Sequence, residues 1–216
     1  MCLSPCGRGD PQYHEGMPEP TDICQQKQQV RAAARANRQK QPNKDQLSRQ
    51  ICQKLAALPE YTAARVVMFY VDFASEVRTQ HFFPTAWAAG KQIVVPYCVK
   101  DRLELFRLEN TDELAPGTVG ILEPRPELRG RPDRQVDVAQ LDLILLPGLA
   151  FDRRGGRIGR GKGYYDRFLR RVRPGTPLVA LAFECQLFAE VPMLPYDKYV
   201  DKVITEASIY TGGPPT

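Results

Sequence analysis

Residues 141–169 have the sequence LDLILLPGLAFDRRGGRIGRGKGYYDRFL, and this stretch is the most informative part of the chain about its fold. It opens at 141–146 with the strongest strand pattern of the chain, dominated by the apolar side chains typical of a parallel strand covered on both faces. A glycine-rich polar turn follows, and then a helix is expected from about Gly163 to Val172. Strand, turn and helix in this order indicate an α/β sheet with a ligand site beyond the carboxyl end of the strand.

Outward from this stretch, strands and helices alternate. Buried strands are expected at 66–71, 93–97, 177–183 and 203–205, with an alternating edge strand at 103–108. Helices are expected at 21–40, at 44–58 and in a segment closed by Gly90, whereas 109–135 has the Pro, Gly and charge content of irregular structure. The pattern predicts a three-layer α/β/α sandwich, Rossmann-like, around a mostly parallel sheet.

The length of 216 residues suits a single domain. Residues 1–20 are rich in Pro, Gly and charge, so we expect a disordered extension there. The domain is then expected at 21–210, with a flexible tail at 211–216.

Composition excludes several classes of protein. Hydrophobic residues make up 43% and charged residues 25%, which are ordinary globular values. No apolar run approaches the roughly 18 residues of a membrane helix, and the first residues lack a secretory pattern, so a soluble, cytoplasmic protein without a membrane partner is expected. The six cysteines fit no zinc or disulfide spacing and are expected to be reduced thiols. With only two histidines, a histidine metal site or a Ser-His-Asp triad is excluded.

Positive charge is concentrated in one window. Residues 153–173 hold nine basic side chains and one acid, a net charge of +8, while the rest of the chain carries −3. Five of the sixteen glycines lie in the same window. A nucleic-acid surface would spread its cations along a face, whereas this concentration on a turn indicates a discrete anion site.

Two familiar phosphate-binding patterns fail here. Gly156-x-x-x-x-Gly161-Lys162 continues with Gly163, so the Mg²⁺-binding hydroxyl of a Walker A motif is missing, and no register gives Gly-x-Gly-x-x-Gly. The features that the two motifs have in common are nevertheless present. Glycines let backbone N–H groups approach an oxyanion closely, and the positive end of the following helix is directed at the same place. Asp166 is a candidate Mg²⁺ ligand, with a helix-capping role as the alternative. For the whole turn, the alternative is a flexible basic hairpin.

The block 147–169 closely resembles the signature of 5-formyltetrahydrofolate cyclo-ligases, also called methenyltetrahydrofolate synthetases. Weaker similarities follow in the family's order, over roughly residues 24–206: Lys27-x-x-x-Arg31, SerGluValArgThr at 75–79, GlyLysGlnIleValValPro at 90–96, GlyIleLeuGluPro at 120–124 and AspLysValIleThrGlu at 201–206.

The resemblance implies an enzyme that uses ATP and Mg²⁺ to close 5-formyltetrahydrofolate to 5,10-methenyltetrahydrofolate, releasing ADP and phosphate. The formyl oxygen would attack the γ-phosphate, N10 would attack the activated carbon, and phosphate would leave. Phosphoryl transfer needs positioning and charge neutralisation rather than a protein nucleophile, so the scarcity of histidine agrees with this reading. A monomer without nucleic-acid partners is expected.

Site residues are implied by the same resemblance. Lys162, Arg157 and Tyr164 would be catalytic, and Asp166 and Asp197 would hold Mg²⁺. ATP would contact Lys27, Arg31, Arg157, Ile158, Gly159, Arg160, Gly161, Lys162, Gly163, Tyr164 and Tyr165. The folate would contact Val71, Glu76, Tyr97, Tyr164 and Tyr165.

Each of these residues also has a plainer interpretation. Lys27 and Arg31 could lie on a solvated helix face. Glu76 could be a negative charge at the start of a helix, where it interacts favourably with the helix dipole. Asp197 could be a turn residue, and Tyr97 could be a core aromatic.

The chain also departs from the family pattern at two positions. An aromatic residue is expected where Val119 stands, and His-Asp where the chain has Tyr196-Asp197.

Three other functions compete with the family reading. A nucleic-acid-binding protein would use the +8 window and show strongly salt-dependent binding. A phosphosugar isomerase would need a general base such as Glu76 or Asp152 but no ATP. A binding module that senses ATP without turnover is the third.

Overall fold

The computed structural model describes residues 20–117 and 120–213. The expectations for the leader at 1–19, for Val119 and for 214–216 therefore lie outside the described residues.

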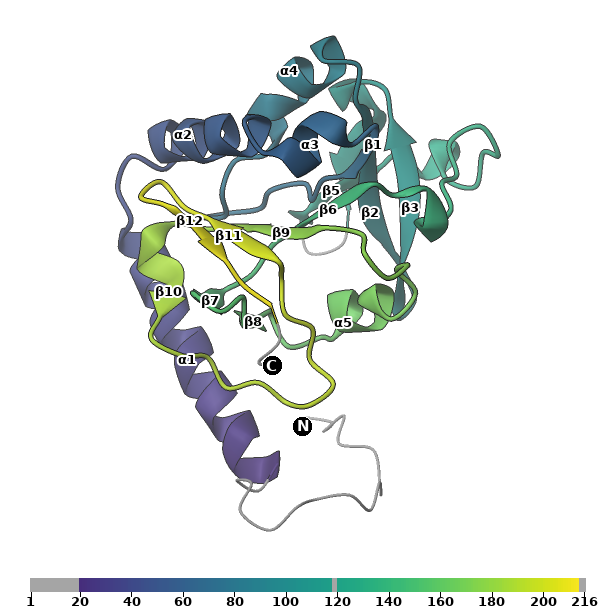
Figure 1. Cartoon of the computed structure of the whole chain (residues 1–216). Helices are drawn as coiled ribbons and strands as arrows, with labels where there is room; N and C mark the ends of the chain where they lie inside the picture. Colours follow the sequence, from purple (N-terminus) through teal and green to yellow (C-terminus); the bar gives the residue numbers. More distant parts are fainter. Residues whose placement is uncertain (1–19, 118–119, 214–216) are drawn as a thin grey trace.

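A seven-stranded sheet forms the centre of the fold (Figure 1), in the order β12-β11-β9-β6-β1-β2-β3. The five central strands are parallel, and both edge strands pair antiparallel to their neighbours. This confirms the mostly parallel sheet and the edge position of 103–108. The strands are β1 (Val66–Met68), β2 (Gln92–Val99), β3 (Arg102–Leu108), β6 (Leu143–Leu146), β9 (Leu178–Leu181), β11 (Lys202–Ile204) and β12 (Ile209–Thr211).

Strand β6 lies in the middle because all four of its residues are apolar and none needs solvent. Each side chain from Leu143 to Leu146 is fully buried. β6 pairs in parallel with β1 through Val67 and Leu143, and with β9 through Leu145 and Val179. Side chains on both faces of β6 are thus covered, as expected from the sequence.

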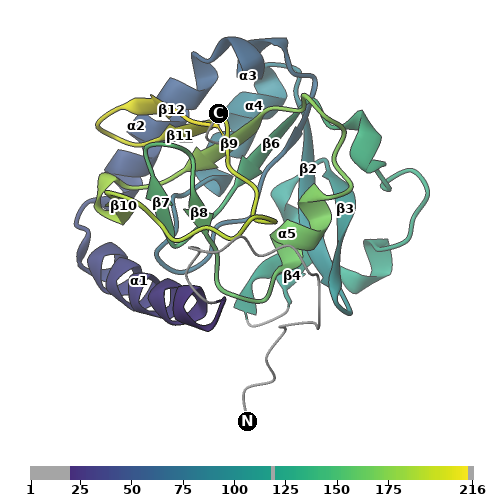
Figure 2. The same cartoon turned by 60° about the horizontal axis from the view of Figure 1, so that its bottom comes forward.

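Helices cover one face of the sheet (Figures 1 and 2): α2 (Lys44–Ala56), α3 (Pro59–Ala63) and α4 (Phe83–Ala88). Ile51 and Leu55, one helical turn apart on α2, pack with Phe83 of α4 against the alternate strand residues that include Val67 and Leu145. The expected helix at 44–58 ends at Ala56, and Pro59 starts α3 instead, since proline suits the first turn of a helix.

The opposite face is covered by a mixed layer. Helix α5 (Tyr164–Leu169) contributes Phe168 and Leu169 to the packing. Beside it lies a small sheet in the order β10-β7-β8, made of β7 (Ala150–Asp152), β8 (Arg157–Ile158) and β10 (Leu187–Phe188). The long helix α1 (Pro20–Lys40) packs Ala34 against Ala150 and Ile158 of this small sheet. The three-layer prediction is confirmed, although α5 is shorter than the expected 163–172.

The sheet has a switch point between β1 and β6. After β1 the chain adds β2 and β3 on one side, and after β6 it adds β9, β11 and β12 on the other. Ligands of open α/β sheets bind outside the carboxyl ends of the strands at such a point. The loops that leave these two strands, after Met68 and after Leu146, are therefore the place to look for a site.

Two segments are more ordered than expected. Within 109–135 there is a hairpin of β4 (Leu114–Pro116) and β5 (Leu122–Pro124), and Arg134 forms ion pairs with Glu109 and Glu113 beside it. Each of these strands has only three residues, which is too few to produce a recognisable hydrophobic pattern in the sequence. At the other end, the backbone N–H groups of Gly212 and Gly213 donate hydrogen bonds to the carbonyls of Asp201 and Arg154. Backbone hydrogen bonding to the rest of the fold therefore continues past residue 210.

Within the described ranges, no helix combines the length and apolarity needed to cross a bilayer. The described cysteines, Cys24, Cys52, Cys98 and Cys185, are free thiols, as expected, although Cys24 is exposed rather than packed. Burial raises the pKa of the Cys52 thiol to about 12.

Gly155 offers a test of how tightly the glycine turn is packed. Its φ is +86°, and a Cβ there would lie 2.1 Å from the Val200 carbonyl oxygen, whereas Gly175 has a similar φ of +84° with open space around it. Gly175→Ala should cost only the left-handed penalty, about 1–2 kcal/mol. Gly155→Ala should cost about 1–3 kcal/mol more from overpacking, measured by urea unfolding. Equal losses in the two variants would contradict the close approach.

Candidate functional site

The two loops beyond β1 and β6 meet each other. Arg160 of the glycine-rich loop donates a hydrogen bond of 2.8 Å from its Nη2 to Oε1 of Glu76 in the loop after β1. The Arg160 guanidinium also lies 5.1 Å from the centre of the Phe73 ring, a cation–π distance. Two segments 84 residues apart in sequence thus form one site.

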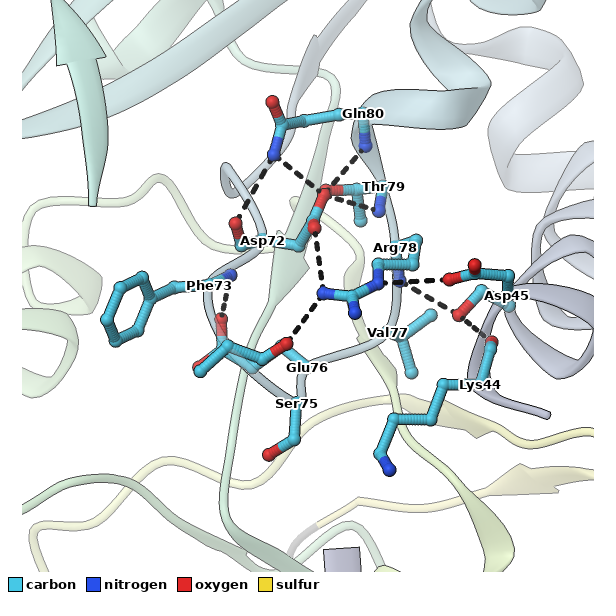
Figure 3. Close-up of polar contacts among 12 residues, drawn as sticks. Lys44, Asp45, Asp72, Phe73, Ser75, Glu76, Val77, Arg78, Thr79 and Gln80 are labelled. Carbon is cyan, nitrogen blue, oxygen red and sulfur yellow. Dashed lines mark hydrogen bonds and ion pairs between the residues drawn. The ribbon is translucent and has the colours of Figure 1, made fainter. Parts of the chain in front are cut away.

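Asp72 organises the loop after β1 (Figure 3). Its Oδ1 accepts hydrogen bonds from the backbone N–H groups of Thr79 and Gln80 at 3.0 and 2.9 Å, and from the side-chain amide of Gln80 at 3.1 Å. Arg78 reaches from the same loop to Asp45 of α2. These contacts hold Ala74 at a φ of +55°, a conformation that costs an alanine free energy and persists only where neighbours enforce it.

Glu76 is a buried carboxylate with cations on one side. Its side chain is 11% exposed, and its Oε2 accepts a hydrogen bond from the Phe73 backbone N–H at 3.1 Å. Arg38 and Arg160 both face Oε1. No helix starts at Glu76, since the next helical turn begins at Gln80, so the helix-charge interpretation is wrong.

The inward face of α1 carries cations. Lys27, Arg31, Ala34 and Arg38 follow each other at helical spacing, and all four are buried or half-buried. Ala34 packs into the apolar cluster, while the three cations point to polar groups of the loops. The solvated-face interpretation of Lys27 and Arg31 is therefore wrong.

Lys27 lies against Asp197. The Lys27 ammonium forms an ion pair with Asp197 Oδ2, and both side chains are 11% exposed. The same oxygen accepts a hydrogen bond from the Leu194 backbone N–H at 2.8 Å, so Asp197 closes a turn as well as pairing with Lys27. Tyr196, beside it, is 54% exposed.

Arg31 contacts the glycine-rich loop. Its Nε donates to the Gly159 carbonyl at 3.0 Å, and its guanidinium would lie 3.5 Å from a Cβ at Gly161, whose φ is +95°. Burial and the nearby Arg35 lower the pKa of Arg31, while Asp197 and Asp166 among others act in the opposite direction. Both carboxylates therefore lie within electrostatic reach of one guanidinium.

Arg157 is the most buried cation of the loop. Its side chain is 3% exposed, and its NH2 donates to Asp166 Oδ1 at 2.7 Å. NH1 makes a longer hydrogen bond of 3.3 Å to the Pro147 carbonyl, and Nε has no partner. The guanidinium lies 5.8 Å from the Tyr165 ring centre. A buried N–H without an acceptor is unusual in proteins, so this guanidinium has unused hydrogen-bonding capacity.

Asp152 shapes the turn itself. It is 1% exposed and accepts backbone N–H groups at 2.9 to 3.0 Å from Arg154, Gly156 and Val191. Its oxygens are occupied in holding the β7–β8 hairpin, so it is not available as a general base. The turn is indeed a hairpin; Gly155 to Ile158 are buried, whereas 153–154 and 160–162 on either side are exposed.

Some predicted residues lie at the edge of this arrangement. Tyr164 donates through its hydroxyl to the Lys100 carbonyl at 3.2 Å, and Lys162 is exposed. Tyr97 is 8% exposed, packs in the core and lies 5.2 Å from the Arg129 guanidinium, which favours the core interpretation. Val71 and Ile158 are buried and Tyr165 is half-buried, each packing in a different apolar cluster. α5 has only six residues, so we assign no dipole contribution to Gly163.

Sequence reasoning missed the roles of three residues that build the site, Arg38, Asp72 and Asp152, the last of which it considered only as the general base of an isomerase. Arg38 could have been found, because it continues the Lys27 and Arg31 face at positions i+11 and i+7. The roles of Asp72 and Asp152 depend on backbone N–H groups that no residue pattern displays.

A model of the 5-formyltetrahydrofolate cyclo-ligase family matches residues 23–206. The chain belongs to this family. A mouse protein named 5-formyltetrahydrofolate cyclo-ligase is 32% identical over 192 residues, which cover 84% of this chain and 90% of the mouse protein. The Escherichia coli (strain K12) protein of the same name is 27% identical over 169 residues, 76% of this chain and 91% of its own.

Solved structures agree. The NMR structure of the Aquifex aeolicus 5,10-methenyltetrahydrofolate synthetase has a TM-score of 0.74 at 29% identity, covering 88% of this chain and 95% of that protein. A Mycoplasma pneumoniae structure at 22% identity, with a TM-score of 0.64 over 86% of this chain and 99% of its own, supports the fold. The chain is thus an enzyme of this ligase family, with its α/β fold.

The donor set suits a magnesium ion carried by a nucleotide. In the described part of the chain, no three His, Cys, Asp or Glu side chains gather into a metal-binding group. Asp166 pairs with Arg157 and Asp197 with Lys27, and both carboxylates lie within electrostatic reach of Arg31. Mg²⁺ typically takes one or two protein carboxylates and completes its shell with water and phosphate oxygens, which this pair fits.

The Arg157–Asp166 pair should respond asymmetrically to mutation. Asp166→Ala leaves a nearly fully buried guanidinium with one long hydrogen bond, and should lower the free energy of unfolding by about 3 kcal/mol. Arg157→Met leaves a carboxylate that is 39% exposed and can hydrate, so a loss of about 1 kcal/mol or less is expected. Urea unfolding of both variants checks this, and a larger loss in Arg157→Met would refute the burial argument.

Proposed function

We propose that this protein converts 5-formyltetrahydrofolate to 5,10-methenyltetrahydrofolate with ATP and Mg²⁺, releasing ADP and phosphate. One observation carries the proposal: in a chain of this family, Lys27 and Arg31 of α1 contact the Asp197 turn and the glycine-rich loop, and Arg160 of that loop contacts Glu76 at the switch point of the sheet. This arrangement suits a reaction in which a polyphosphate binds next to a second substrate that presents a polar ring system.

The triphosphate would lie along the loop from Arg157 to Tyr165. Lys27 and Arg31 would close over it from α1, and Lys162 is exposed and free to turn toward phosphate oxygens. The free Nε donor of Arg157 suits a phosphate oxygen, and guanidinium groups bind such oxygens with two parallel hydrogen bonds. Asp166 and Asp197 would hold Mg²⁺, which when bound neutralises charge on the phosphate oxygens.

The pterin would bind at the Glu76 loop. An ionised carboxylate only accepts hydrogen bonds, which matches the N–H groups on one edge of a pterin ring. Val71 would pack on the ring, Tyr164 and Tyr165 would line the formyl side, and Tyr97 would lie further out in the core.

The reaction then needs no protein nucleophile. The formyl oxygen attacks the γ-phosphorus, ADP leaves, and an N5-iminium phosphate results. N10 attacks the formyl carbon, and the C–O bond breaks to release phosphate. The protein orients the two substrates and balances the charge of the transferred group, which is the main requirement of phosphoryl transfer. Within 20–117 and 120–213, the sole histidine, His81, is exposed and takes no part.

The rival functions are less well supported by the geometry. Arg154, Arg157 and Arg160 are each paired with an acid, unlike the free cations of a nucleic-acid surface. The isomerase would need Asp152 or Glu76 as a base, and both are engaged. An ATP-sensing module differs only in turnover, which the next experiment decides. The monomeric state and cytoplasmic location stay predictions, testable by size-exclusion chromatography and cell fractionation.

The direct test mixes pure protein, Mg-ATP and 5-formyltetrahydrofolate and follows the absorbance band of the methenyl product. The band should grow with time and stop growing when EDTA is added, because the metal is required. A folded protein that binds Mg-ATP yet gives no band would refute the enzyme proposal and leave the sensing module. Strong, salt-sensitive RNA or DNA binding without turnover would favour the nucleic-acid reading.

Loop cations should matter far more than other charges of the +8 window. Arg157→Ala and Lys162→Ala should each lower kcat/KM by a factor corresponding to about 3–4 kcal/mol of transition-state stabilisation, since each removes a preorganised charge contact. Arg170→Ala, an exposed cation of the same window, is the matched control and should stay near wild type. Wild-type turnover from either loop variant would contradict the loop assignment.

A further inference from the structure

Arg38 is a buried cation that the reaction as proposed does not use. It lies on the inward face of α1, and only 4% of the residue is exposed. Its Nε donates to Ser75 Oγ at 2.9 Å, and its NH1 donates to the Gly148 carbonyl at 3.2 Å and lies 4.0 Å from Glu76 Oε1. One side chain thus joins α1, the Glu76 loop and the start of the glycine-rich segment.

The burial of Arg38 is costly. Loss of solvation lowers the pKa of its guanidinium, Arg160 lowers it further, and the main opposing influence is Glu76. An ion pair at 4.0 Å does not recover this cost well, and apolar side chains often stabilise such positions better. Arg38 is hydrogen-bonded, but its ion pair with Glu76 is long, so the charge itself adds little stability and points to a task other than stability.

The two guanidiniums that face Glu76 differ in how exposed they are and in how many other groups hold them. Arg160 makes the shorter contact, at 2.8 Å, but its side chain is 39% exposed and lies on the loop proposed to bind the triphosphate. Arg38 is 5% exposed and fixed by hydrogen bonds to two other segments. If Arg160 turns to a phosphate, Arg38 is the cation that still faces Oε1.

We infer that Arg38 is a positioning residue for folate binding: it holds the Glu76 carboxylate in place and in register with the glycine-rich loop while Arg160 serves the nucleotide. Arg38 acts through Glu76 and touches neither substrate. This inference rests on the proposed function, because it assigns Glu76 to the folate.

The test measures binding of 5-formyltetrahydrofolate by calorimetry in the presence of a saturating Mg²⁺ complex of a non-hydrolysable ATP analogue. Arg38→Met should weaken folate binding at least about tenfold, the effect of losing roughly one charged contact. Affinity for the analogue, measured alone, should stay within about twofold of wild type. Arg38→Lys should recover part of the folate affinity, because it restores the charge without the fork of donors.

A double-mutant cycle with Glu76→Gln separates positioning from general support of the fold. If Arg38 acts through Glu76, the double variant Arg38→Met/Glu76→Gln binds folate no more weakly than Glu76→Gln alone. Lys40→Met removes an exposed cation from the same helix and is the matched control, expected to bind both ligands as wild type does. Should Arg38→Met not fold, Arg38→Lys and Arg38→Gln carry the cycle.

Three results would overturn the inference: unchanged folate affinity in Arg38→Met, equal losses for folate and analogue, or additive losses in the double variant. A wild-type protein that binds no folate at all would instead overturn the proposed function, so the two failures are distinguishable.

Discussion

The structure depends on the burial of cations along one face of α1. A buried charge must be paired or hydrogen-bonded, or it destabilises the fold. Lys27, Arg31 and Arg38 meet this requirement by contacting three different loops, through Asp197, the Gly159 carbonyl and the Ser75–Gly148 pair of acceptors. The helix therefore ties together segments that the central sheet only brings near each other, and the site is a consequence of how these charges are satisfied.

The sheet supplies the other half of the arrangement. Because β1 and β6 are adjacent, parallel and at the switch point, the loops that follow them emerge at the same edge. Asp72 and Asp152 then fix the two loops in the same way, each by accepting several backbone N–H groups with one carboxylate. With each loop held by a carboxylate-centred turn, Glu76 and Arg160 point at one another.

Proposed ligand contacts and observed internal contacts coincide in this site. Asp166 and Asp197 pair with Arg157 and Lys27, and Glu76 pairs with Arg160. The three carboxylates assigned to a metal or a pterin are thus each held by a cation. Such pairing keeps the site compact and its charges compensated, and the binding of anionic and polar substrates exchanges partners rather than burying new charge.

The sequence alone was enough to predict the α/β class, the buried strand at 141–146, the edge strand and the family, while the anion-binding role of the glycine-rich loop stays a prediction. These are local properties, since apolar runs, glycine spacing and charge clusters are visible along the chain. Only the tertiary structure decided that Arg38 faces Glu76, that Tyr164 turns to the Lys100 carbonyl, that Tyr97 packs in the core and that 109–135 forms a hairpin. Those outcomes depend on which distant backbone and side-chain groups satisfy each buried polar atom, and that balance is set by three-dimensional packing rather than by sequence spacing.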